Sequence, residues 1–152
     1  MTKPFPLQPL LDLSKDRLDG ATRELGRLIA TEQESVRKLE LLQNYRDEYE
    51  ARFRGAMSGG IGVEALRNYS AFIARIDEAI AQQRAQVNQQ QNRTSAGKQV
   101  WMQHRNQVKA FDTLANRHLT IETRKQAKAE QRLLDEFSSN RFHRRAEEQN
   151  DH

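Results

Sequence analysis

Apolar side chains in the first third of the chain recur at alternating intervals of three and four residues. This sevenfold spacing puts one stripe of side chains along a helix, as at the a and d positions of a coiled coil. The stripe consists of Leu11, Ser14, Leu18, Ala21, Leu25, Leu28, Glu32, Ser35, Leu39, Leu42, Arg46, Tyr49, Phe53 and Ala56, without a skip. We therefore predict one long helix over about residues 10–56.

A cluster of glycines follows this repeat. Four of the seven glycines of the chain lie between Gly55 and Gly62. Glycine readily adopts positive φ angles and ends helices, so a reversal of the chain is expected here, over about residues 57–63.

A second repeat of the same period begins after the glycines. It places in one stripe Leu66, Tyr69, Ile73, Ile76, Ile80, Gln83, Val87, Gln90, Thr94, Gly97, Trp101, His104, Val108 and Phe111. Folding the chain about Gly59 and Gly60 sets Leu39 near Ile80 and Ala21 opposite Gly97, and both stripes then end together. The pattern predicts an all-α fold: a single domain that forms a long antiparallel two-helix coiled-coil hairpin.

The pattern changes after Phe111, because Leu114 and Ile121 leave the stripe while His118 and Glu122 enter it. The first helix has no residues left to pair with this part of the chain. We expect the second helix to cover about residues 64–140, to overhang the first at its C-terminal end, and to give way to a frayed tail over residues 141–152. The arginine-rich tail is either a solvated end or a contact for an acidic partner.

The edges of the hairpin are normally charged, but near the turn they are apolar. Tyr45, Ala65, Phe72 and Ala79 occupy g positions of the two heptads. With neighbouring stripe residues they predict an exposed apolar strip, whose candidate binding residues are Leu42, Tyr45, Tyr49, Phe72, Ile76 and Ala79. The strip either widens a thin core or docks a protein partner, and we favour docking because no third element is available to cover it.

Several stripe positions are polar. Glu32, Ser35 and Arg46 in the first helix and Gln83, Gln90 and Thr94 in the second lie where a coiled coil usually has apolar residues. These side chains either fix the register or weaken the middle of the hairpin so that it can bend.

Composition agrees with a thin seam rather than a globular core. Of the residues, 36% are hydrophobic and 30% are charged, and the mean hydropathy is −0.93. The absence of cysteine, and of any apolar run near the ~20 residues of a membrane span, indicates a cytoplasmic protein. The net charge of +4 leaves a nucleic-acid-binding hairpin as a minor hypothesis, since acidic and basic residues are interspersed.

No pattern of catalytic residues is present. A phosphate loop is suggested by the run Gly59-Gly60-Ile61-Gly62. However, no strand is predicted before this run, and no Lys-Ser or Lys-Thr pair follows it. The four histidines lack the spacing of metal ligands. We predict that the protein is not an enzyme and uses no cofactor or metal.

Three segments resemble a known family. The run LELLQNYRDEY at residues 39–49, the MSGGI turn at 57–61, and NYSAFI at 68–73 with Ala79 and Ile80 are similar to the flagellar type III export protein FliJ family. The likeness is strongest over residues 39–87 and is compositional beyond residue 87.

This resemblance implies a cytoplasmic export factor, peripherally associated with the inner membrane at the flagellar base. Its implied partners are the hexameric ring of the flagellar export ATPase, the cytoplasmic domain of the export gate and export chaperones, and not nucleic acid. The gate contact would fall on the six strip residues, whereas Lys38 and Gln83 depart from the family pattern. The ring contact would involve the N-terminal residues and the overhanging helix. The alternative is a generic coiled-coil adaptor or a stalk subunit of another rotary ATPase.

Overall fold

The computed structural model describes residues 2–151, which form two helices and no strand. Helix α1 spans Gln8–Met57 with 50 residues, and helix α2 spans Val63–Asn150 with 88 residues. The predicted all-α helical hairpin is therefore confirmed. Contacts divide the chain into two compact units: a hairpin unit, Leu18–His104, and a terminal unit formed by the described residues on either side of it.

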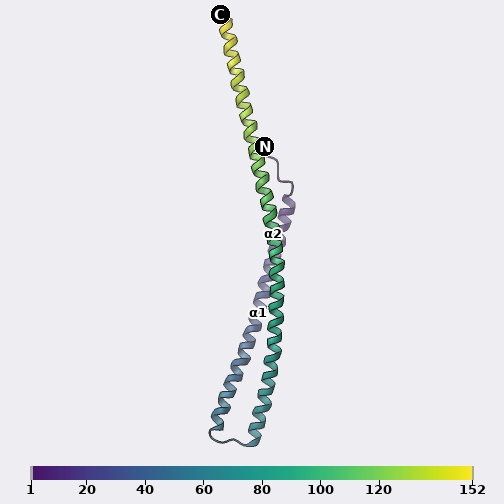
Figure 1. Ribbon diagram of the computed structural model, residues 1–152, viewed down its shortest axis with the longest axis vertical. Coiled ribbons are helices and arrows are strands. Elements are labelled where there is room, and N and C mark those ends of the chain that lie inside the picture. Colours follow the sequence, from purple (N-terminus) through teal and green to yellow (C-terminus); the bar gives the residue numbers. More distant parts are fainter. Residues whose placement is uncertain (1, 152) are drawn as a thin grey trace. The chain divides into compact units, whose positions relative to one another are not determined.

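The hairpin unit contains the turn and the adjoining parts of the two helices (Figure 1). The chain enters the turn from α1 and leaves it into α2, which runs in the opposite direction. The turn occupies residues 58–62, inside the predicted range. Gly60 has a φ of 80°, a conformation that glycine adopts without steric strain. Gly59 N–H donates to the Ala56 carbonyl at 3.2 Å, so the last backbone carbonyls of α1 are partly satisfied within the turn.

The heptad stripes form the seam between the helices. In the part of the chain that the structure describes, every buried residue lies at a predicted stripe position. These residues are Leu11, Ser14, Ser35, Ile76, Ile80, Val87, Gln90, Thr94 and Val108. The sevenfold assignment is thus confirmed, including its polar members.

The predicted pairing of Ala21 with Gly97 is wrong. A Cβ atom built on Gly97 would lie 2.6 Å from Leu28 Cδ1 and 3.7 Å from Leu25 Cδ1, while no atom of Ala21 comes within 4 Å of it. The reason is that α2 is displaced along α1 relative to the predicted register, so Thr94 bonds to the Leu28 carbonyl and Gly97 lies nearest Leu25 and Leu28. Gly97 is the floor of a hole that Leu28 fills.

The terminal unit differs from its prediction at its beginning. The N-terminal residues pair with the part of α2 that was expected to have no partner: the Lys3 carbonyl lies 2.9 Å from His118 Nε2, and Lys3 N–H donates to Glu122 Oε2 at 3.4 Å. The Phe5 ring centroid lies 5.6 Å from that of His118. Pro4 and Pro6 keep this segment out of a helix, and a non-helical chain can cover up to about 3.3 Å per residue against about 1.5 Å for a helix. A few residues therefore reach far along α2.

The rest of α2 has no intramolecular cover. Every residue from Thr123 to Asp151 is exposed, so the predicted overhang is present. The helix continues to Asn150, however, and the expected frayed tail from residue 141 is wrong over the described residues. No glycine or proline follows Gly97, so nothing in the sequence interrupts the helix. Residue 152 lies outside the described residues.

Candidate protein-binding surface near the turn

Five aromatic rings join α1 and α2 near the turn. Tyr45, Tyr49 and Phe53 follow one another at intervals of four on α1, and Tyr69 and Phe72 lie three apart on α2. The ring centroids of Phe53 and Tyr69 are 3.5 Å apart and those of Tyr49 and Tyr69 are 5.6 Å apart, both pairs stacked. The rings of Tyr49 and Phe72 are tilted at 4.1 Å.

A fourth pair of rings, Tyr45 and Phe72, reaches the surface. The rings of Tyr45 and Phe72 meet edge to face, with centroids 5.9 Å apart and planes at 77°. Tyr45 remains 51% exposed, whereas Phe72 and Tyr49 are half-buried. Edge-to-face aromatic pairs contribute about 0.5–1.5 kcal/mol beyond the burial of their area. The cluster therefore holds an accessible tyrosine ring on one edge of the hairpin unit.

Of the six predicted strip residues, Tyr45 and Tyr49 both contact Phe72, and the six are not equally exposed. We call them the apolar edge: Leu42, Tyr45, Tyr49, Phe72, Ile76 and Ala79. Ile76 is buried with 7% exposure, so its prediction as an exposed contact is wrong; its heptad position points between the helices. Leu42 and Ala79 are half-buried.

One exposed apolar residue beside this edge was missed. Leu41 is 68% exposed and lies four residues before Tyr45, on the same side of α1. The heptad reasoning considered only the seam and its two edges, and Leu41 occupies a position outside both. The four-residue spacing from Tyr45 was the signal that could have found it.

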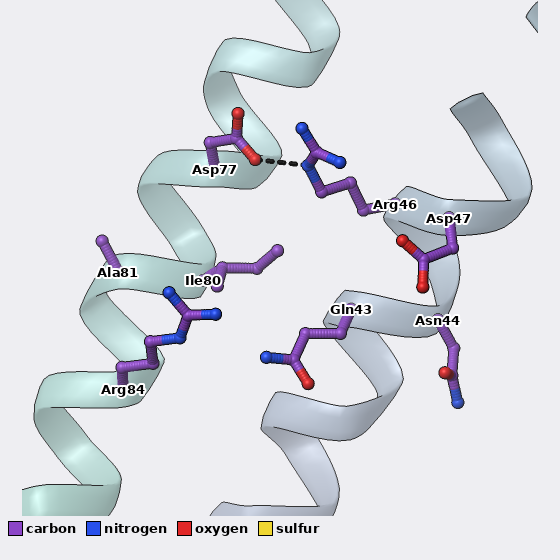
Figure 2. Close-up of a pocket in the computed structure, with 8 residues that line it drawn as sticks. All are labelled: Gln43, Asn44, Arg46, Asp47, Asp77, Ile80, Ala81 and Arg84. Atoms are coloured by element: carbon purple, nitrogen blue, oxygen red, sulfur yellow. Dashed lines mark hydrogen bonds and ion pairs between the residues drawn. The ribbon is translucent and has the colours of Figure 1, made fainter.

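The other edge of the hairpin unit is polar at the same level. A groove of about 530 Å³ lies between α1 and α2. It is lined by the eight residues drawn in Figure 2: Gln43, Asn44, Arg46, Asp47, Asp77, Ile80, Ala81 and Arg84. Arg46 Nε donates to Asp77 Oδ1 at 2.5 Å, and Arg46 Nη1 lies 3.2 Å from Glu50 Oε2. The hydrogen bond from Arg46 to Asp77, with their mutual attraction, raises the pKa of Arg46 above its ordinary value. Arg46 is a stripe residue, but its guanidinium group lies on this polar edge rather than in the seam.

Two other polar stripe residues bond across the seam. Gln83 Nε2 donates to the Ser35 carbonyl at 2.9 Å, and Thr94 Oγ1 donates to the Leu28 carbonyl at 3.5 Å. Each bond reaches the backbone of the opposite helix. These contacts favour the hypothesis that polar stripe residues fix the register.

A metal site is not evident in the described part of the chain. Residues 2–151 contain no group of three or more His, Cys, Asp or Glu side chains placed to hold a metal ion. Within the same range, neither helix has a segment long and apolar enough to cross a membrane.

Fold and surface together define a class: an all-α coiled-coil hairpin with a bare aromatic edge near its turn and an exposed helical overhang. Comparison with known families is more specific. The model of the flagellar FliJ protein family matches residues 2–147. The chain belongs to this family, which confirms the resemblance noted in its sequence and supports a role in flagellar protein export.

Individual relatives match over nearly their whole length. The flagellar FliJ protein of Escherichia coli K12 is 29% identical over 141 residues, 93% of this chain and 96% of that protein. The flagellar FliJ protein of Salmonella typhi is 28% identical with the same coverage, and that of Bacillus subtilis 168 is 20% identical over 142 residues, 93% of this chain and 97% of that protein. A solved structure from Chlamydia trachomatis, described as a YscO homolog, shares 21% identity over 91% of this chain and 94% of its own, with a TM-score of 0.46.

Proposed function

We propose that this protein is a stalk of the flagellar type III export apparatus that binds two partners, the hexameric export ATPase and the cytoplasmic domain of the export gate, and that it escorts export chaperones. It acts in the cytoplasm, peripherally associated with the inner membrane at the flagellar base. The observation that carries the proposal is the Tyr45–Phe72 contact, which holds an aromatic ring half out of the seam in a member of this family.

The apolar edge is the proposed gate contact. Tyr45 is its accessible anchor; Phe72 packs against that ring edge to face, and Tyr49 packs against Phe72. Ile76 contributes as the buried residue under the edge rather than as a contact. Aromatic residues dominate binding energy at protein interfaces because they bury a large area with few rotatable bonds.

The alternative hypothesis, that the apolar edge only widens the core, agrees less well with the exposure of Tyr45. A side chain that is 51% exposed contributes only part of its area to packing within the chain. Tyr45 therefore has unused apolar surface that a partner can bury.

The proposed ATPase contact lies in the terminal unit, where α2 is joined by the first residues of α1 and by the non-helical N-terminal segment. Such an asymmetric stalk meets the subunits of a ring unequally. A ligand shifts an equilibrium only through its differential affinity for the states involved. Unequal contacts would bias the assembly or turnover of individual ATPase subunits in this way.

The test measures binding of the full-length chain to each partner separately. Replacing both Tyr45 and Phe72 by alanine should weaken gate binding at least about 30-fold, the ~2 kcal/mol of an interface hot spot. Binding to the ATPase should stay unchanged. Gln43→Ala on the polar edge is the matched control and should leave both affinities unchanged.

Two outcomes contradict parts of the proposal. Unchanged gate binding by the double variant would remove the apolar edge as the gate contact. A folded wild-type chain that binds neither the flagellar ATPase nor the gate would instead favour a generic adaptor or a stalk of another rotary ATPase.

A further inference from the structure

The uncovered part of α2 carries large apolar side chains in the open. Leu133, Leu134 and Phe137 are 66%, 62% and 67% exposed. Residues three and four apart lie on the same face of a helix, so the three side chains share one face. In Figure 1 this green-to-yellow part of α2 runs with no other segment beside it. An isolated helix gains nothing within the chain from such a cluster.

Charges on the same face are arranged symmetrically about Phe137. Glu130 lies seven residues before it and Arg144 seven residues after it. Seven residues are nearly two helical turns, so both charges share the face of Phe137. Leu133 lies four residues before Phe137 and Arg141 four residues after it. We call Glu130, Leu133, Leu134, Phe137, Arg141 and Arg144 the tail face.

The tail face is self-complementary. In an antiparallel pair with Phe137 on the twofold axis, each Glu130 meets Arg144 of the other copy, and each Leu133 meets the aliphatic stem of Arg141. Within residues 2–151 none of the three charged side chains forms an ion pair in its own chain. All three are exposed and available.

We propose that the tail face binds a second copy of this chain as an antiparallel helical pair. A purely acidic partner would satisfy Arg141 and Arg144 but would leave Glu130 facing like charge. A second copy pairs Glu130 with Arg144 of the other chain, and the twofold symmetry forms this ion pair twice. The contact is small, so the dimer is a weak one that forms at micromolar or higher concentration. The tail face shares no residue with the apolar edge, so this inference stands whether or not the proposed gate contact does.

Analytical ultracentrifugation of the full-length chain tests the proposal. The wild type should convert from monomer to dimer over a range of about 5–200 µM. Glu130→Arg and Arg144→Glu should each weaken dimerisation at least about tenfold, because each replaces two ion pairs by two like-charge contacts. The Glu130→Arg/Arg144→Glu double variant restores opposite charges and should recover the wild-type constant. Glu136→Arg, roughly 100° around the helix from Phe137, makes the same charge change and should have no effect.

A chemical crosslink gives a second readout. The chain has no cysteine, so a single introduced thiol reports only its own position. Phe137→Cys should form a disulfide-linked dimer on mild oxidation, because two residues on a twofold axis approach each other. Ser139→Cys, on the far side of the helix, should remain mostly monomeric.

Three results would overturn the proposal. A wild type that stays monomeric throughout the concentration range would leave the tail face for a different protein. A dimer insensitive to both single charge reversals would form through another surface. A double variant no better than the single variants would exclude the Glu130–Arg144 pairing.

Discussion

Gly97 offers the sharpest test of the seam. Replacing it by alanine adds one methyl group whose carbon would lie 2.6 Å from Leu28 Cδ1 and 3.7 Å from Leu25 Cδ1. The first distance is too short for two carbon atoms, which prefer about 3.5–4.0 Å. Leu28 must therefore rotate or the helices must separate.

The size of the effect follows from two opposing contributions. Alanine stabilises a helix interior by about 0.8–1.0 kcal/mol relative to glycine. Overpacking a close contact destabilises by about 1–3 kcal/mol. We expect the Gly97→Ala variant to lose between about 0 and 2 kcal/mol in its free energy of unfolding, with the seam contact outweighing the gain in helix propensity.

Gly26→Ala is the matched control. Gly26 lies in α1 of the same hairpin unit, and a Cβ atom there meets nothing within 4 Å. This variant has the higher helix propensity of alanine without a steric clash. Its free energy of unfolding should therefore rise by about 0.5–1 kcal/mol. Urea unfolding followed by circular dichroism measures both variants at one temperature. Equal stabilisation by the two substitutions would show that Leu28 does not fill a tight hole over Gly97.

Two further substitutions test contacts in the separate units. Asp77→Asn removes the charge that Arg46 pairs with on the polar edge and should lower the free energy of unfolding only slightly, since the pair is partly exposed. Thermal unfolding at low and high salt measures this loss, and an equal loss at both would contradict an electrostatic origin. Phe5→Ala removes the ring beside His118 and should shift the imidazole proton signals of His118 in NMR spectra towards those of an exposed histidine, whereas unchanged signals would show that the N-terminal segment does not pack there.

Much of the hairpin unit could be predicted because a sevenfold repeat fixes which side chains meet. A period of seven leaves one choice of buried stripe, and the glycine cluster leaves one place for the reversal. The contact of Tyr45 with Phe72 followed from the same register, since the two residues hold equivalent edge positions on antiparallel helices.

The misses have separate physical causes. The pairing at Gly97 depends on how far one helix slides along the other, and a heptad pattern fixes the facing stripe more strongly than this offset. The burial of Ile76 follows from its d position, and its assignment to an exposed strip gave too much weight to its neighbours. The packing of Lys3 and Phe5 on α2 was missed because a proline-rich segment has no period to read.

The two edges of the hairpin unit show how a seam with few apolar residues can still prepare a binding surface. Arg46 occupies a stripe position, but its guanidinium extends to Asp77 on the polar edge. The charged groups therefore lie on the polar edge, and the rings of Tyr45 and Phe72 lie on the apolar edge. A partner with an apolar groove gains by burying the second edge and would have to strip water from an ion pair to bury the first. Under the function proposed above, Arg46 therefore matters for docking because it keeps its charge on the edge opposite the proposed gate contact.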